Sequence, residues 1–419
     1  MKVYLLIIVA ALGYFVDIYD LVLFNVVKKE SLEYIMAGAS PQEIKDTGIF
    51  LFNMQMLGML LGGLLWGVMG DKRGRVAVLF GSILLYSAAN LANAFVFDLS
   101  LYAVIRVIAG IGLAGELGAG ITLVSETMSK EKRGYGTMII VTFGALGAVL
   151  ASQVAGNGAW FSQIITNISG YSLMNWQVAY IIGGVLGLLL LLLRVGSLES
   201  DMFKDTKEAA HIKKGDFSLL FKEGRFKKYV YCILVGLPIW YVIGVLVALS
   251  EEEFAPLFGI TGVKNGTAIM YAYLGLSIGD LLSGLISQIM KSRKKVVFLY
   301  LIFNLILVLI FLFGLYGASK EVYYLMTFLL GAGTGYWAIF ITIASEQFGT
   351  NIRSTVTNTV PNFVRGSVPI ITNLFKFLIV PIGSIGSAGV VGLLCMGLAA
   401  WACSQLEESF GKDLNYNEQ

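Results

Sequence analysis

The chain reads Gly67-Val-Met-Gly70-Asp71-Lys72-Arg73-Gly74-Arg75 between two long apolar runs. Its glycines give the backbone the freedom that a tight turn needs, and its charges belong in water at a membrane surface. A carboxylate at a helix end can pair with nearby cations and hold two helix ends together. We therefore expect a short surface turn in which Asp71 and Arg75 have a gating or structural role.

The apolar runs on either side of this turn belong to a series that extends over the whole chain. Hydrophobic residues make up 57% of the 419 positions and charged residues 14%, more apolar surface than a soluble core can bury. Because about 20 mostly apolar residues cross a bilayer as a helix, such runs can be counted as spans. The sequence predicts an all-α membrane protein with twelve spans, at 3–27, 49–70, 76–97, 100–126, 134–156, 176–194, 229–250, 266–290, 296–316, 322–346, 355–378 and 385–404.

Several functional classes find no support in the sequence. The three cysteines, Cys232, Cys395 and Cys403, lie in apolar runs, which argues against a disulfide scaffold. No metal-ligand cluster, nucleophile elbow or nucleotide-binding loop is present. The net charge of +3 is no nucleic-acid footprint in so apolar a chain. We therefore expect a protein that is not an enzyme and has no metal, no cofactor and no nucleic-acid partner.

The placement of lysine and arginine predicts the orientation in the membrane, because cationic loops remain on the cytoplasmic side. With both termini inside, most of the 30 Lys and Arg residues are cytoplasmic. The opposite side carries only Lys28, Lys29, Lys45, Lys264 and Lys320. We expect an integral protein of a bacterial inner membrane with both termini in the cytoplasm.

The longest polar segment, 195–228, divides the predicted spans into six and six. We interpret it as a cytoplasmic linker between an N-terminal half at 1–194 and a C-terminal half at 229–405, with a cytoplasmic tail at 406–419. The end of the linker, Phe217–Lys228, is either a short amphipathic helix on the membrane surface or a plain solvated segment.

An internal repeat supports this division. The fourth and fifth spans resemble the tenth and eleventh when the chain is shifted by 220 positions. The shift pairs Gly115 with Gly335, Thr122 with Thr342, Ser125 with Ser345, Glu126 with Glu346, Arg133 with Arg353 and Thr137 with Thr357. We expect gating or structural roles for Glu126, Arg133, Glu346 and Arg353.

The glycine-rich turn resembles the loop signature of the major facilitator superfamily, Gly-x-x-x-Asp-Arg-x-Gly-Arg, with Lys72 where arginine is usual. In the second half Gly284 and the basic run Lys291–Lys295 stand in the matching place, with Gln288 where the acid would be. The resemblance implies two pseudo-symmetric six-helix halves that rock to expose a central cavity alternately to each side. It also implies that spans 1, 4, 7 and 10 line the cavity, that spans 2, 5, 8 and 11 form the gates, and that the protein is a monomer.

Two further stretches resemble the proton-coupled phosphate, aromatic-acid and metabolite symporters of that superfamily. They are Gly13-Tyr-Phe-Val-Asp17-Ile-Tyr19-Asp20 and Gly112-Leu-Ala-Gly115-Glu116-Leu-Gly118, the second with Ala114 in place of one glycine. The resemblance implies that aspartates of the first span and the acid of the fourth take part in coupling or substrate binding. The helix-5 Gly-Pro signature of drug antiporters is missing from 134–156, which weighs against drug efflux.

Ionisable residues inside the spans are functional candidates, because each costs about 2.5–3.5 kcal/mol to insert. Six lie well inside: Asp17, Asp20, Arg106, Glu116, Asp280 and Arg365. Asp17 and Asp20 share a helix face, and we assign proton coupling to them and to Glu116. Arg106 lies at the depth of Asp20, so that it either contacts the substrate or forms an ion pair with Asp20.

Arg365 is the preferred candidate for contact with an anionic substrate, because a guanidinium clamps carboxylates and phosphates. It continues a polar stripe with Asn358 and Asn362. Its alternative role is a gate pair with Asp280. The mid-span pairs Trp240-Tyr241 and Tyr336-Trp337 are candidate cavity linings, with lipid-facing or core packing as the alternative.

Together these features predict a proton-coupled symporter of a small anionic or polar metabolite that works by alternating access. Sodium is the alternative coupling ion. A transporter of a neutral sugar or amino acid is the first alternative function, and a solute-binding membrane receptor is the second.

Overall fold

The computed structural model describes residues 2–128, 133–198, 217–222 and 224–412, which form helices and no strand. In the N-terminal half the helices are α1 (Lys2–Ile35), α2 (Pro41–Arg73), α3 (Arg75–Asn93), α4 (Leu99–Leu113), α5 (Glu116–Thr127), α6 (Arg133–Gly156), α7 (Gly158–Ser169) and α8 (Asn175–Leu198). In the C-terminal half they are η2 (Phe217–Phe221), α9 (Arg225–Tyr241), η3 (Val242–Val247), η4 (Ser250–Phe254), α10 (Ala255–Leu257), α11 (Asn265–Met290), α12 (Arg293–Gly314), α13 (Lys320–Gly333), α14 (Trp337–Glu346), α15 (Arg353–Gly366) and α16 (Val368–Gln405).

The predicted number of twelve spans agrees with this structure. Eleven described stretches are long and apolar enough to cross a membrane, and the last of them, Arg353–Gln405, holds two spans. Gly383 interrupts it with a φ of 70°, a left-handed conformation that glycine adopts without strain. This turn lies between the predicted eleventh and twelfth spans.

Local sequence sets several helix boundaries. Ser40 and Glu43 form a reciprocal capping box at the start of α2, with Pro41 as its first residue. Gly74 alone separates α2 from α3, with a φ of 92°. The tight turn that the sequence predicts in the glycine-rich stretch is thus confirmed.

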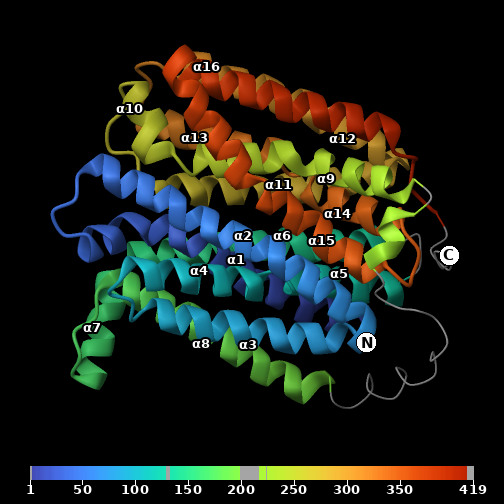
Figure 1. The fold of residues 1–419 in the computed structure, drawn as a ribbon, viewed down its shortest axis with the longest axis horizontal. Helices are drawn as coiled ribbons and strands as arrows, with labels where there is room; N and C mark the ends of the chain where they lie inside the picture. The colour runs from blue at the N-terminus through green and yellow to red at the C-terminus, as the bar shows by residue number, and fades with distance from the viewer. Residues whose placement is uncertain (1, 129–132, 199–216, 223, 413–419) are drawn as a thin grey trace.

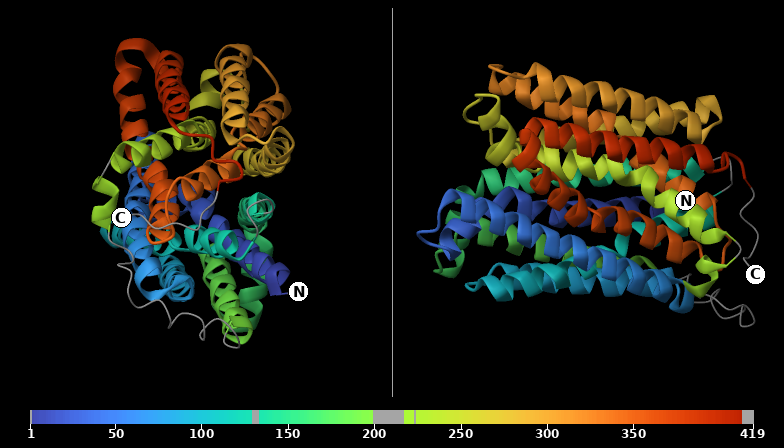
Figure 2. Two further views of the ribbon diagram at one scale, coloured as in Figure 1. Left: turned by 90° about the vertical axis from the view of Figure 1, so that its right-hand side faces the viewer. Right: turned by 45° about the horizontal axis from the view of Figure 1, so that its top comes forward.

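The helices run side by side, so that the bundle has two ends (Figure 1). We call the end where α1 begins and α16 ends the terminus end, and the opposite end, with α7 and α10, the loop end. In Figure 2 the N-terminal half, blue to green, and the C-terminal half, yellow to red, form two adjacent groups. The halves meet mainly where α2 packs against α15 and where α6 packs against α11.

Two corresponding spans of the two halves, which the sequence predicts as continuous, are broken at equivalent places. The fourth is divided between α4 and α5, and the tenth between α13 and α14. The break after Leu113 corresponds to the break after Gly333 at the same offset of 220 positions, so the repeat extends to the broken backbone. Glycines permit the close approach there, since a Cβ on Gly335 would lie 2.3 Å from the Cα of Gly279.

Two other segments differ from the prediction. Residues 158–169, between the predicted fifth and sixth spans, form α7 at the loop end (Figure 1). The predicted linker lies largely outside the described residues. Of its end, Phe217–Phe221 forms a short 3-10 helix, and α9 begins at Arg225, so a single amphipathic helix over 217–228 is not formed.

Candidate functional site

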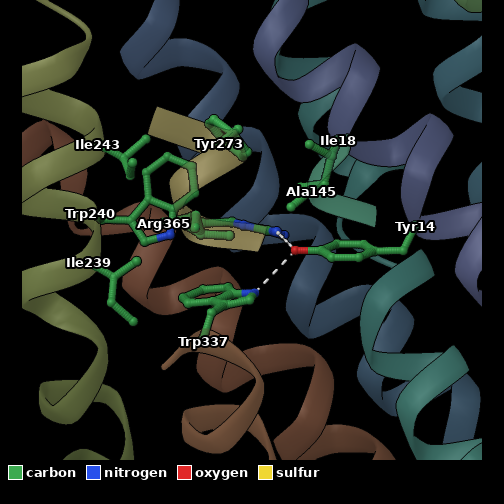
Figure 3. A pocket seen from close by; sticks show the side chains of 10 residues that line it. Tyr14, Ile18, Ala145, Ile239, Trp240, Ile243, Tyr273, Trp337 and Arg365 are labelled. Carbon is green, nitrogen blue, oxygen red and sulfur yellow. Dashed lines mark hydrogen bonds between the residues drawn. The ribbon is translucent and has the colours of Figure 1, made fainter. Parts of the chain in front are cut away.

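A small cavity lies between the two halves. Its walls combine aromatic and aliphatic side chains with a single cation among the residues that line it. These residues are Tyr14 and Ile18 of α1, Ala145 of α6, Ile239 and Trp240 of α9, Ile243 of η3, Tyr273 and Leu276 of α11, Trp337 of α14 and Arg365 of α15 (Figure 3). The first, seventh and tenth spans contribute as the family resemblance implies. The lining includes no residue of the fourth span, and residues of the fifth, eighth and eleventh take part.

Arg365 is the charged group of this cavity. Its guanidinium is buried and donates hydrogen bonds to Asn362 Oδ1 at 3.2 Å and to the Tyr14 hydroxyl at 3.4 Å. It also lies 5.4 Å from the ring centre of Trp337 and 5.8 Å from that of Trp240. No carboxylate of the described chain lies within 4.0 Å of its nitrogens. A buried cation with only neutral partners is costly, and an anion would relieve that cost.

One residue of each predicted aromatic pair lines the cavity. The rings of Trp240 and Trp337 meet edge to face with centres 6.4 Å apart. Tyr241 and Tyr336 do not line it, because their hydroxyls donate to backbone oxygens of the C-terminal half, those of Ala388 and Val235. For these two tyrosines the structure therefore favours the alternative of core packing.

The polar stripe that leads to Arg365 serves to join the halves. Asn362 Nδ2 donates to the Ala114 carbonyl at 2.8 Å, at the break in the fourth span, while its Oδ1 orients Arg365. The broken helix frees carbonyls of this kind, which need new donors. Asn358 donates back to Ser354 O within α15, and neither asparagine belongs to the cavity lining.

Asp17 and Glu116 lie in the interior next to the cavity. Both are buried, and the Asp17 carboxyl interacts electrostatically with Arg365 and with Glu116. Neither oxygen of Asp17 has a hydrogen-bond partner in the described part of the chain. Glu116 is the first residue of α5, where the positive end of the helix dipole favours a carboxylate. The structure thus brings Asp17 and Glu116 together, and Asp17 also interacts electrostatically with Asp20, the third predicted coupling residue.

Asp20 and Arg106 lie inside the N-terminal half instead. The ion pair that the sequence suggests between them is not formed, because other groups hold Arg106. Its guanidinium binds Gln55 Oε1 and, at 3.5 Å, the Tyr180 hydroxyl, and it lies 4.3 Å from the ring centre of Phe24. Arg106 is not part of the cavity lining, and no contact in this structure supports its predicted role in substrate binding.

Asp280 does not pair with Arg365. The gate pair that the sequence analysis gave as the alternative role of Arg365 is thus not formed in this structure. Asp280 Oδ1 accepts a hydrogen bond from the backbone nitrogen of Ala338 at 2.9 Å. Ala338 is the second residue of α14, so the carboxylate meets the positive end of the half-helix that the break creates. The broken span supplies a partner that a continuous helix would have kept for itself.

At the terminus end, Asp71 connects the halves. Its Oδ2 accepts hydrogen bonds from Thr355 N at 2.8 Å and from Thr355 Oγ1 at 2.6 Å, in the first turn of α15. Arg75 lies 3.4 Å from Asp71 Oδ1 and also donates to the Gly70 carbonyl. These contacts support the predicted gating or structural role of both residues.

The other predicted gating residues lie near the same end. Glu346 is buried, 3.4 Å from an Arg293 nitrogen, and accepts a hydrogen bond from Ser409. Arg353 reaches Thr350 Oγ1 at 3.4 Å. The side chains of Glu126 and Arg133 lie outside the described residues, so their roles stay predictions.

At the loop end the structure shows contacts that the sequence analysis missed. The acidic run Glu251–Glu253 of η4 pairs with three lysines of the N-terminal half. We call these three ion pairs the loop-end latch. Lys28 lies 3.0 Å from Glu252, Lys29 lies 3.1 Å from Glu251, and Lys45 pairs with Glu253. Three consecutive glutamates beside an apolar run were the available signal. Contacts between the halves therefore lie on both sides of the cavity.

A central cavity between two six-helix halves, with contacts between the halves at each end, is an arrangement typical of a membrane transporter. A family model described as Major Facilitator Superfamily matches residues 10–384, and the chain belongs to that family. It is therefore an integral membrane transporter of small metabolites, not an enzyme.

Individual relatives share only a modest sequence identity with this chain. A Bacillus subtilis (strain 168) protein assigned as the niacin/nicotinamide transporter NiaP is 26% identical over 375 residues, 85% of this chain and 84% of that protein. The 3-(3-hydroxy-phenyl)propionate transporter of Escherichia coli (strain K12) is 26% identical over 361 residues, 84% and 83% of the two chains. The solved proton:xylose symporter XylE shares the fold with a TM-score of 0.70, at 16% identity and with 99% and 98% of the chains covered.

Proposed function

We propose that this transporter imports a small planar organic acid, such as an aromatic carboxylate, by proton-coupled alternating access. One observation carries the proposal: Arg365 is buried in the cavity between two tryptophan rings, and no carboxylate of the described chain lies within salt-bridge distance. A guanidinium suits a carboxylate, and flat aromatic walls suit a ring. The solute would thus supply the charge that Arg365 lacks.

The relatives support this class of solute. The names of two of them refer to niacin and to a hydroxyphenyl propionate, each of which combines an aromatic ring with a carboxylate. The first name also includes nicotinamide, the neutral amide of the same ring, which makes acid and amide a natural pair for comparison.

For the coupling ion we propose a proton that Asp17 and Glu116 carry. Burying a carboxylate without a hydrogen-bond partner is unfavourable, and protonation removes the charge. Asp17 lies close enough to Arg365 for an electrostatic interaction, so its charge state affects how strongly Arg365 attracts an anion. Asp20, buried away from the cavity, is a further candidate in the same pathway. We place the protein in a bacterial inner membrane with cytoplasmic termini, because the loops expected on the cytoplasmic side hold most of the lysine and arginine. A monomer is proposed from the family resemblance alone.

Uptake into proteoliposomes tests the proposal. An inward proton gradient should drive accumulation of nicotinate or 3-(3-hydroxyphenyl)propionate, and a proton ionophore should abolish it. Accumulation driven by a sodium gradient alone would contradict proton coupling. Preferential transport of neutral sugars or amino acids would contradict the solute class, and binding without transport would indicate a receptor.

Arg365 itself is tested by substitution. Arg365→Lys keeps the charge but loses the planar fork and the stacking on both tryptophans. We expect nicotinate affinity to fall about tenfold or more, the equivalent of one charge-assisted hydrogen bond. Arg106→Lys is the matched control, an equally buried arginine outside the cavity. Unchanged nicotinate affinity in Arg365→Lys would refute the contact.

A further inference from the structure

Two hydrogen-bond donors of the C-terminal half converge on one oxygen of the N-terminal half. Trp337 Nε1 donates to the Tyr14 hydroxyl at 3.1 Å, and Arg365 Nη2 donates to the same oxygen at 3.4 Å. Figure 3 shows Tyr14 entering the cavity from the side opposite Trp240, with both bonds ending on its oxygen. These bonds therefore tie the two halves together inside the cavity, away from the contacts at either end.

The Tyr14 hydroxyl oxygen is a weaker hydrogen-bond acceptor for these two donors than a carboxylate oxygen would be. A phenol oxygen that accepts from a guanidinium and an indole occupies the place that one carboxylate oxygen would take. It is neutral, however, whereas a carboxylate adds the attraction of opposite charges and can accept two parallel hydrogen bonds from the guanidinium. Arg365 also keeps an Nε donor without any partner in the described structure. The groups of the described chain thus leave this cation incompletely satisfied.

The position of the Tyr14 ring is fixed from behind. Tyr14 is buried, and a Cβ built on Gly144 of α6 would lie only 2.0 Å from its Cδ1 atom. Any side chain at position 144 would therefore push the ring away. The glycine lets Tyr14 lie against α6 while its hydroxyl reaches the C-terminal half.

We propose that the Tyr14 hydroxyl holds the place of a solute carboxylate oxygen, and that an entering carboxylate takes over its hydrogen bonds to Arg365 and Trp337. Tyr14 is then a positioning residue with two effects. It competes with the anion, and it ties the halves together until the anion arrives. This inference rests on the proposed function, because it takes Arg365 as the partner of the anion.

The proposal links binding to movement. A ligand shifts a conformational equilibrium only by its difference in affinity for the two states. A carboxylate that replaces the Tyr14 hydroxyl binds Arg365 and Trp337. At the same time it removes the two hydrogen bonds that hold the halves together at this point. A neutral amide accepts hydrogen bonds less strongly and should displace Tyr14 less well. Tyr14 should therefore be displaced from Arg365 and Trp337 more readily by acids than by amides.

Binding to Tyr14→Phe tests the competition. With the full-length purified protein we expect the Kd for nicotinate and for benzoate to fall about tenfold, because the internal competitor is gone. The Kd for nicotinamide and benzamide should fall less. Tyr336→Phe is the matched control, since it removes a hydroxyl beside Trp337 whose bond stays within the C-terminal half. Weaker nicotinate binding in Tyr14→Phe would overturn the proposal and make Tyr14 a direct ligand, and an unchanged Kd would also overturn it.

A measurement without solute tests the tie between the halves. Backbone hydrogen exchange in α14 and α15 should be faster in Tyr14→Phe than in the wild type or in Tyr336→Phe. Gly144→Ala, which displaces the ring by another route, should reproduce that increase. Equal exchange in all of these proteins would overturn the tie. If the wild type binds no carboxylate at all, the proposed function fails; if it binds one and Tyr14→Phe behaves like the wild type, only the role of Tyr14 fails.

Discussion

The role of a buried ionisable residue in this transporter depends on which hydrogen-bond or ion-pair partner the fold places next to it. Asp280 and Arg365 are both buried ionisable groups of the C-terminal half, and an ion pair between them was one of the two roles predicted for Arg365. In the structure Asp280 binds the first turn of α14, and Arg365 is left to neutral acceptors. Asp280 thereby supports the start of α14, and Arg365 has no carboxylate partner in the described chain, which is why we propose it as the contact for the solute.

Asp280 should matter for stability more than for solute affinity. Asp280→Ala leaves the backbone N–H of Ala338 without its acceptor and should cost about 1–2 kcal/mol. Asp280→Asn retains an oxygen acceptor and should cost less. Thermal unfolding of the purified variants measures the difference. A normal melting temperature for Asp280→Ala would mean that this contact contributes nothing.

The proposed coupling residues give a separate prediction at this scale. In proteoliposomes Asp17→Asn and Glu116→Gln should lose proton-driven accumulation and keep solute exchange, because the cavity remains while the proton carrier is gone. Counterflow and pH-gradient uptake distinguish the two activities. Full accumulation in both variants would remove these residues from the coupling mechanism.

At the scale of elements, α2 and α15 cross closely near the terminus end. Gly63 and Gly67 of α2 face α15, and a Cβ on Gly67 would lie 3.1 Å from the Cα of Thr355. One turn further along, Asp71 accepts its two hydrogen bonds from that same threonine. The glycines allow the helices to approach, and the carboxylate fixes their register.

Gly67→Val should force this crossing apart. The added side chain meets the backbone of α15, and overpacking of this kind costs about 1–3 kcal/mol. We expect labelling of a cysteine placed at the terminus end of α2 to become faster. Gly397→Val is the matched control, because no atom lies within 4 Å of a Cβ at that helix position. Equal labelling in both variants would contradict a gate at this crossing.

At the scale of the whole molecule, the loop-end latch lies on the opposite side of the cavity from the crossing at the terminus end. Burial raises the pKa of Glu251, but the hydrogen bond from the Asn265 backbone and the pairing with Lys29 outweigh that effect and lower the pKa below its ordinary value. A group with a lowered pKa in the closed state stabilises that state at higher pH. The stabilisation is lost as the pH falls through the lowered pKa.

The latch should therefore weaken on acidification below the ordinary pKa of a glutamate, about 4.3. Salt should weaken it as well, because Lys29 is half exposed. Distance measurements between spin labels on the loop ends of α1 and α11 can follow the opening. An opening that ignores both pH and salt would show that the latch does not hold this end.

Charge exchange tests the same latch at its most buried pair. Lys28→Glu places two carboxylates together, and breaking a buried pair costs about 3–5 kcal/mol. Adding Glu252→Lys restores opposite charges and should recover closure. If the double variant stays as open as Lys28→Glu alone, the pair of Lys28 with Glu252 does not set the closure.

The sequence by itself determined the membrane fold, the number of spans, the tight turn at Gly74 and the repeat, because hydropathy and turn chemistry are properties of neighbouring residues. It also singled out Arg365, Trp240 and Trp337, since ionisable and aromatic groups in mid-span are recognisable one at a time. Only the tertiary structure decided which of these groups meet. It separated Asp20 from Arg106, gave Asp280 to a broken helix, joined Tyr14 to Arg365 and matched three lysines with three glutamates. Each partnership depends on how helices far apart in the sequence are rotated and spaced against each other, and local sequence patterns do not reveal that rotation.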